Sequence, residues 1–93
     1  MAFVTLRGEL DMLAVGDLEP ELERLECEGT VDVVALDLRE LFFLDSSGLR
    51  TILLFGGRLG EFDRRLVLVR GPQAVQRVFE MAGLLDELPF ARR

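Results

Sequence analysis

Histidine, tryptophan and tyrosine are absent from this 93-residue chain, and Cys27 is its only cysteine. A single cysteine cannot form an internal disulfide. With one thiol and no histidine, a zinc site would have to be built mainly from carboxylates, which is an unfavourable ligand set, so we expect no metal site. A serine hydrolase usually needs a histidine base, so the sequence argues against that class and we expect no enzyme.

Long hydrophobic runs are also missing. The longest apolar stretches are far shorter than the about 18–20 residues that a membrane-spanning helix needs, and the N-terminus, MAFVTLRGELD, lacks the basic and apolar regions of a secretion signal. The formal net charge of −6 disfavours nucleic acid and anionic lipid as partners. We therefore expect a cytoplasmic protein without a nucleic-acid or membrane partner.

What is present indicates a single domain over residues 1–93. Hydrophobic residues make up 49% of the chain, enough for a packed core. Patterns typical of strands occur over residues 2–7, 31–38 and 65–70. Helical patterns begin at Asp17 (with Pro20 in the first turn and Gly29 as the stop), after Asp45, and at Gly71-Pro72 with Gly83 as the stop. Residues 84–90 are expected to form a short strand or turn. Such alternation predicts an α/β fold with a largely parallel sheet.

The segment Asp45-Ser46-Ser47-Gly48 lies between two apolar runs, at the expected start of the second helix. Aspartate and serine are favoured helix N-caps, so a purely structural cap is the first interpretation. The flanking residues do not match a nucleophile elbow, which needs a glycine where Leu44 stands. The glycine-rich stretch at 56–60 lacks the lysine of a phosphate-binding loop. We expect neither hydrolysis nor nucleotide binding, and no cofactor.

A second interpretation makes the serine a substrate. A hydroxyl exposed at a helix N-terminus can be reached by a kinase, and the positive end of the helix dipole tolerates the added charge. Phosphorylation would add about −1.5 to −2 charges to the surface.

The helix that follows has one apolar face suited to covering a sheet, made of Leu49, Ile52, Leu53, Gly56 and Leu59. Leu54 and Phe55 fall outside this face. Two interpretations stay open: Leu54 is a single exposed residue of no consequence, or it forms a partner site together with Ser46, Ser47 and Arg50.

Three stretches carry a family resemblance over nearly the whole chain: GELD at 8–11, LDLRELFFLDSSGLRTIL at 36–53 and VFEMAGLLDELPF at 78–90. They resemble the STAS domain of bacterial anti-sigma factor antagonists. The resemblance implies a single STAS-like domain, with a mixed, mainly parallel β-sheet and helices mostly on one face. It also implies that Ser46 is the phosphoacceptor.

The resemblance further implies a partner, an anti-sigma factor that is also a serine kinase. The unphosphorylated antagonist would bind this kinase and release the sigma factor, phosphorylation of Ser46 would end the binding, and a phosphatase would reset the switch. ATP and magnesium would belong to the kinase. The predicted neighbourhood of the phosphoserine is Asp11, Asp45, Ser47 and Gly48, and the predicted partner contacts are Leu49, Arg50 and Leu54. Turn geometry at Gly8 is an alternative reason for the GELD segment.

Two departures from the family pattern bear on function. Family members usually carry a further strand before the one that ends in GELD, so an open sheet edge and a homodimer or larger assembly are conceivable. Arg50 and Thr51 stand where smaller or aliphatic residues are common, which could alter the choice of partner. An alternative role is that of an unphosphorylated STAS scaffold or accessory subunit in a signalling or transport assembly.

Overall fold

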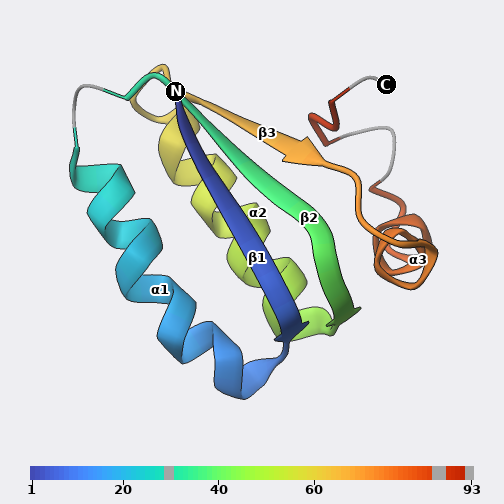
Figure 1. The fold of residues 1–93 in the computed structure, drawn as a ribbon. Helices are drawn as coiled ribbons and strands as arrows, with labels where there is room; N and C mark the ends of the chain where they lie inside the picture. Colours follow the sequence, from blue (N-terminus) through green and yellow to red (C-terminus); the bar gives the residue numbers. More distant parts are fainter. Residues whose placement is uncertain (29–30, 85–87, 92–93) are drawn as a thin grey trace.

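The computed structural model describes residues 1–28, 31–84 and 88–91. Their elements, in chain order, are strand β1 (Ala2–Leu10), helix α1 (Met12–Cys27), strand β2 (Val33–Leu44), helix α2 (Ser46–Gly60), strand β3 (Arg65–Val69) and helix α3 (Gln73–Met81). The strands form a parallel sheet in the order β1-β2-β3 (Figure 1). This confirms the predicted α/β fold.

The two faces of the sheet differ in their environment. Alternate residues point to opposite faces, and those of one face form the core together with α2, which lies behind β1 and β2 in Figure 1, and α1 beside it. The strand residues of this core are Leu6, Leu10, Val34, Leu36, Leu38, Leu41, Leu44, Leu66 and Leu68. No helix covers the other face in the described part of the chain, so the sheet and its helices form two layers.

The first strand and helix differ from the prediction, because β1 runs on to Leu10 and α1 begins at Met12 rather than at Asp17. Pro20 was placed in the first turn but lies inside the helix, where it cannot donate the hydrogen bond to residue 16. Residue 16 is a glycine, and a Cβ added to Gly16 would have no neighbouring atom within 4 Å. The predicted stop at Gly29 lies outside the described residues.

Strand β2 is also longer than predicted, extending to Leu44 instead of ending at Leu38. Thr5 pairs with Asp37 while Glu9 pairs with Phe43, and the register shifts twice in between. Four residue steps along β1 therefore match six along β2, so β2 carries two extra residues as bulges. Gly8, at the second shift, has a φ of 78°, which a residue with a side chain rarely adopts.

Helix α2 was expected to expose part of its apolar surface, and for Phe55 this is wrong. Phe55 is fully buried, whereas Leu54 is 48% exposed. The reason is that α2 packs against β3 on one side and against α1 on another, so its buried stripe is wider than a sheet alone would require.

The third strand and helix follow the prediction closely. Helix α3 ends at Met81 and Gly83 adopts a φ of 74°, as a glycine stop predicts. Beyond it, Phe90 forms an isolated parallel bridge with Leu68 of β3. The rest of the predicted strand or turn at 84–90 includes residues 85–87, which lie outside the described residues.

A buried arginine side chain makes hydrogen bonds to the carboxyl end of α1. Arg64, between α2 and β3, donates hydrogen bonds to the carbonyl oxygens of Leu25 (2.6 Å), Glu26 (2.8 Å) and Val31 (2.6 Å). The last carbonyls of a helix have no partner within it. Arg64 therefore supplies the hydrogen bonds that two of the last turn's carbonyls lack.

Helix α2 approaches the sheet closely at Gly48 in its first turn. A Cβ built there would lie 2.5 Å from the carbonyl oxygen of Leu10 and 2.8 Å from a side-chain atom of Leu44. The clash would be partly with backbone, which cannot rotate away. Only glycine lets the helix begin this close to the ends of β1 and β2.

The uncovered face of the sheet carries an ion pair within β2. The guanidinium of Arg39 donates to both carboxylate oxygens of Asp37 at 2.9 Å, and the backbone N–H of Arg39 donates to the same carboxylate at 3.0 Å. The Asp37 side chain is only 3% exposed beneath the arginine. These hydrogen bonds lower the pKa of Asp37, against the opposing effect of its burial.

Replacing Gly48 by alanine is expected to lower the free energy of unfolding by about 2–4 kcal/mol, because the added methyl group overlaps the Leu10 carbonyl. Urea denaturation measures the change. Gly57→Ala in the same helix is the matched control: an added Cβ meets nothing within 4 Å there, so the helix should gain about 0.5–1 kcal/mol. A Gly48→Ala protein as stable as the Gly57→Ala protein would contradict the packing described.

The Asp37–Arg39 pair should make the free energy of unfolding depend on pH. Because the pKa of Asp37 is lower in the folded chain, its contribution is present above the unfolded value of about 4 and is lost as the pH falls through the folded pKa. Asp37→Asn should therefore be less stable than the wild type at pH 7, and the two should converge as the pH falls below about 4. Urea denaturation at pH 7, 5 and 3 tests this. Asp32→Asn, which removes an exposed carboxylate, is the control; a constant gap between Asp37→Asn and the wild type would refute the linkage.

Candidate functional site

Two aspartates mark the edge of the sheet where β1 and β2 end. Asp11 is the N-cap of α1, and its Oδ1 accepts a hydrogen bond from the backbone N–H of Ala14 at 2.9 Å. Asp45 is the N-cap of α2, and its Oδ1 accepts from the N–H of Gly48, also at 2.9 Å. Each carboxylate thus satisfies an N–H that has no partner inside its own helix. Both strands pass into their helices with a single capping residue between.

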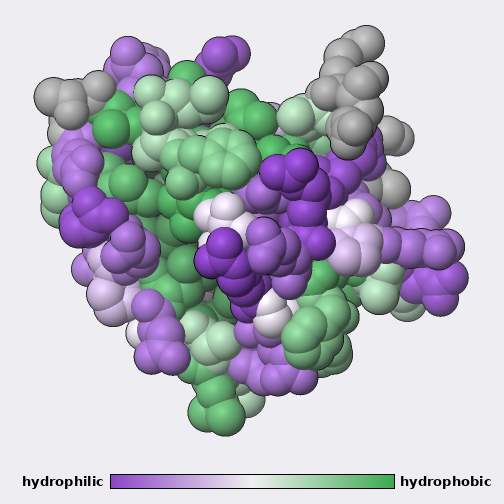
Figure 2. Space-filling model, in the orientation of Figure 1, coloured by the Kyte–Doolittle hydropathy of each residue, from purple (hydrophilic) through white to green (hydrophobic). Residues whose placement is uncertain are grey.

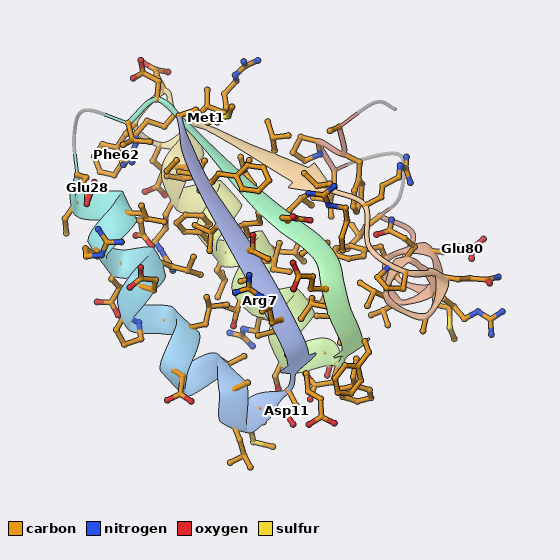
Figure 3. All side chains as sticks on the ribbon, viewed as in Figure 1. Met1, Arg7, Asp11, Glu28, Phe62 and Glu80 are labelled. Atoms are coloured by element: carbon orange, nitrogen blue, oxygen red, sulfur yellow. The ribbon has the colours of Figure 1, made fainter. Side chains whose placement is uncertain are left out.

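The two caps lie at neighbouring positions because the strands that carry them are hydrogen-bonded. Leu10 pairs with Leu44, and the N–H of Asp45 donates to the carbonyl of Leu10 at 3.2 Å. The same Leu10 carbonyl lies against Gly48. The positive ends of two helix dipoles therefore meet at one edge of the sheet, at the bottom of Figure 1, where Figure 3 labels Asp11.

Ser46 is the first residue of α2 and is exposed, in contrast to the residues after it. Ser47 is half-buried and Gly48 is buried. Asp45, Ser47 and Gly48 lie at the start of α2, and Asp11 caps α1 on the adjacent strand. The only hydroxyl of this segment that lies fully at the surface belongs to Ser46.

Of the three predicted partner contacts, Leu49 is a correction. It belongs to the core, with 9% of its surface exposed, because the helix turns it toward the sheet. Arg50 and Leu54 are exposed, and with Ser46 they follow the i, i+4, i+8 spacing of one helix stripe. The partner site envisaged along α2 is thus restricted at the surface to Ser46, Arg50 and Leu54.

Thr51, noted with Arg50 as a departure from the family pattern, lies beneath the surface. It is buried, and its hydroxyl donates to the carbonyl oxygen of Ser47 at 3.0 Å. Its hydrogen bond acts within the helix, so of these two residues only Arg50 can touch a partner.

The chain has no histidine to act as a base for Ser46. Among residues 1–28, 31–84 and 88–91, no three histidine, cysteine, aspartate or glutamate side chains are grouped to bind a metal ion. Nor does any helix in this part of the chain have the length and apolar composition to cross a membrane.

Sequence reasoning missed two features of this edge. The cap at Asp11 was overlooked because Pro20 was assigned to the first helical turn, although an aspartate directly before Met12-Leu13-Ala14-Val15 is itself an N-cap signal. The exposure of both Phe42 and Phe43 was also missed. The exposure of the two phenylalanines depends on the second bulge in β2, and no local sequence pattern predicts that bulge.

Known proteins of similar sequence include several antagonists. The anti-sigma F factor antagonist of Lysinibacillus sphaericus is 32% identical over 84 residues, covering 87% of this chain and 69% of the relative. The anti-sigma-B factor antagonist of Staphylococcus epidermidis is 32% identical over 83 residues, covering 89% and 76%. BtrV of Bordetella bronchiseptica is 35% identical over 91 residues, covering 98% and 78%.

Solved structures of anti-sigma factor antagonists are similar to this chain as well. The anti-sigma factor antagonist SpoIIAA in its unphosphorylated form superposes with a TM-score of 0.81 at 27% identity, covering 98% of this chain and 79% of SpoIIAA. The phosphorylated form of SpoIIAA from Bacillus gives 0.72 at 26% identity, covering 98% and 82%. An antagonist from Mycobacterium paratuberculosis, at 24% identity and a TM-score of 0.86, supports the fold, with coverage of 98% and 76%.

STAS antagonists are binding proteins rather than enzymes. The family model for the STAS domain matches residues 1–93, and the chain belongs to the STAS domain family.

Proposed function

We propose that this chain is an anti-sigma factor antagonist whose binding is switched off by phosphorylation of Ser46. The observation that carries the proposal is the exposed Ser46 hydroxyl at the start of α2, beside an aspartate that already caps the helix. Because Asp45 makes the capping hydrogen bond, a phosphate on Ser46 removes no bond that the fold needs. It changes only the surface that a partner meets.

The partner would be an anti-sigma factor with serine kinase activity, supplying ATP and magnesium itself, in the cytoplasm. The names of the relatives support an anti-sigma factor as the partner. The kinase step is supported by the similarity to SpoIIAA, which is known in unphosphorylated and phosphorylated forms. A phosphatase would return Ser46 to the binding form.

Physical chemistry makes such a switch effective at low cost to the fold. A phosphoserine carries about −1.5 to −2 charges at neutral pH and would stand beside the Asp45 carboxylate. A partner that docks there must desolvate this charge or turn acidic groups away from it. A tenfold loss of affinity corresponds to about 1.4 kcal/mol, a small part of that penalty.

Binding to the host's anti-sigma factors, each purified, tests the proposal by calorimetry. The wild type and Ser46→Ala should bind one of them equally well, while Ser46→Asp and the enzymatically phosphorylated wild type should bind at least tenfold more weakly. With the same kinase and MgATP, the wild type and Ser47→Ala should each gain one phosphate by intact mass. Ser46→Ala should gain none.

Equal affinity of the Ser46→Ala, Ser46→Asp and phosphorylated proteins would rule out the switch. The chain would then be better described as a constitutive STAS scaffold or accessory subunit. Phosphate gained by Ser46→Ala and lost in Ser47→Ala would move the acceptor to the half-buried neighbour, Ser47.

A further inference from the structure

Large apolar side chains are exposed at the same edge of the sheet as Ser46. Met12 and Leu13, the first two residues of α1, are 73% and 86% exposed, and Phe42 and Phe43 near the end of β2 are 65% and 46% exposed. We call these four residues the apolar rim. Figure 2 shows hydrophobic side chains along this lower edge of the molecule, interspersed with polar ones.

The exposure of the two phenylalanines is a consequence of the second bulge in β2. In a regular strand, neighbouring residues point to opposite faces, so one of the two would join the core. Gly8 pairs with Leu41 and Glu9 with Phe43, which leaves Phe42 as the extra residue. Leu41 and Leu44 enter the core on either side, and both phenylalanines remain outside. The bulge thus displays two large aromatic side chains that the core does not use.

The position of the apolar rim ties it to Ser46. Met12 directly follows one helix cap, and Phe43 lies two residues before the other. The strands that carry them are adjacent, and neighbouring strands lie about 4.8 Å apart. A typical interface covers about 800 Å² on each partner, equivalent to a disc of roughly 16 Å radius. A protein that docks around Ser46 with such an area would cover these side chains.

The charge of the chain argues against a second copy of it as the protein that covers the apolar rim. The formal net charge is −6, so two copies repel each other. Glu9 is exposed and pairs with Phe43 in the sheet, so in a symmetric contact at this edge it would lie near the Glu9 of the second copy. A different protein with an apolar docking face and no excess of acidic groups fits better.

We infer that the apolar rim is the surface on which the anti-sigma factor docks, with Ser46 inside its boundary. This inference rests on the function proposed above and names the surface through which the switch acts. Aromatic side chains at the centre of an interface carry much of the binding free energy when water is excluded from them. A phosphate on Ser46 brings a strongly hydrated charge into that area, which explains in physical terms why one modification would weaken the whole contact.

Substitutions in the apolar rim provide the test. Leu13→Ser and Phe42→Ser remove exposed side chains, so both proteins should unfold in urea at concentrations close to that of the wild type. Their affinity for the purified host anti-sigma factor should fall at least tenfold in calorimetry. Phe62→Ser is the matched control, because Phe62 is 69% exposed but lies in the turn after α2, at the opposite end of the molecule from Asp11 (Figure 3). Its affinity should stay within twofold of the wild type.

The outcomes separate this inference from the proposed function. If the rim variants bind like the wild type while phosphorylation of Ser46 still weakens binding, the inference is overturned and the switch stands. If no host anti-sigma factor binds, the proposed function fails and the inference fails with it. If phosphorylation has no effect while the rim variants bind at least tenfold more weakly, the switch fails and the docking surface stands. A wild-type dimer in sedimentation that Phe42→Ser dissociates would identify a second copy as the occupant and overturn the inference as well.

Discussion

The contact between the first turn of α2 and the carbonyl of Leu10 is the constraint on which this structure depends. It requires a glycine at position 48, and it fixes where α2 begins relative to β1. The carbonyl of Leu10 also accepts the N–H of Asp45, so one backbone group joins the end of β1 to both the cap and the first turn of α2. Asp11 then starts α1 directly beside it. The exposed position of Ser46 is a result of this packing, since the residues on either side of it are held in place by other contacts.

The same edge explains why the two central strands differ in length. β1 is a nine-residue strand and β2 a twelve-residue strand, yet both must reach the edge where their helices begin. The extra residues of β2 are taken up in bulges, and one bulge opens next to Gly8. Gly8 therefore has a local structural role in the GELD segment, as the alternative interpretation held, while Asp11 at the end of that segment caps α1. The segment combines a backbone requirement and a position at the candidate site.

The sequence predicted the order of elements, the parallel sheet and the serine at a helix start because these depend on local patterns. Alternating strands and helices limit the possible topologies to a few, and Asp45 is a strong cap signal. One error was local: Pro20 argued for a helix start, but α1 begins at Met12, where Asp11 is the N-cap. The other errors arose where tertiary packing decides. Leu49 was predicted both on the sheet-covering face of α2 and as a partner contact, and only the first prediction agrees with its burial against the sheet. Phe55 was assigned to a flank, and it is buried because α2 meets α1 as well as the sheet.

Through Arg64, the last turn of α1 is hydrogen-bonded to the distant segment between α2 and β3. Gly16 and Pro20 give α1 a low intrinsic helical tendency, and its last turn is bonded to a side chain 38 and 39 residues further along. These hydrogen bonds can form only when the segment between α2 and β3 lies against that turn, which carries the entropy cost of closing a long loop. An opening of the α2–β3 turn in the native state would break the Arg64 hydrogen bonds at the carboxyl end of α1 at the same time. The two regions should behave as one cooperative unit in hydrogen exchange, although the sequence separates them by the whole of β2 and α2.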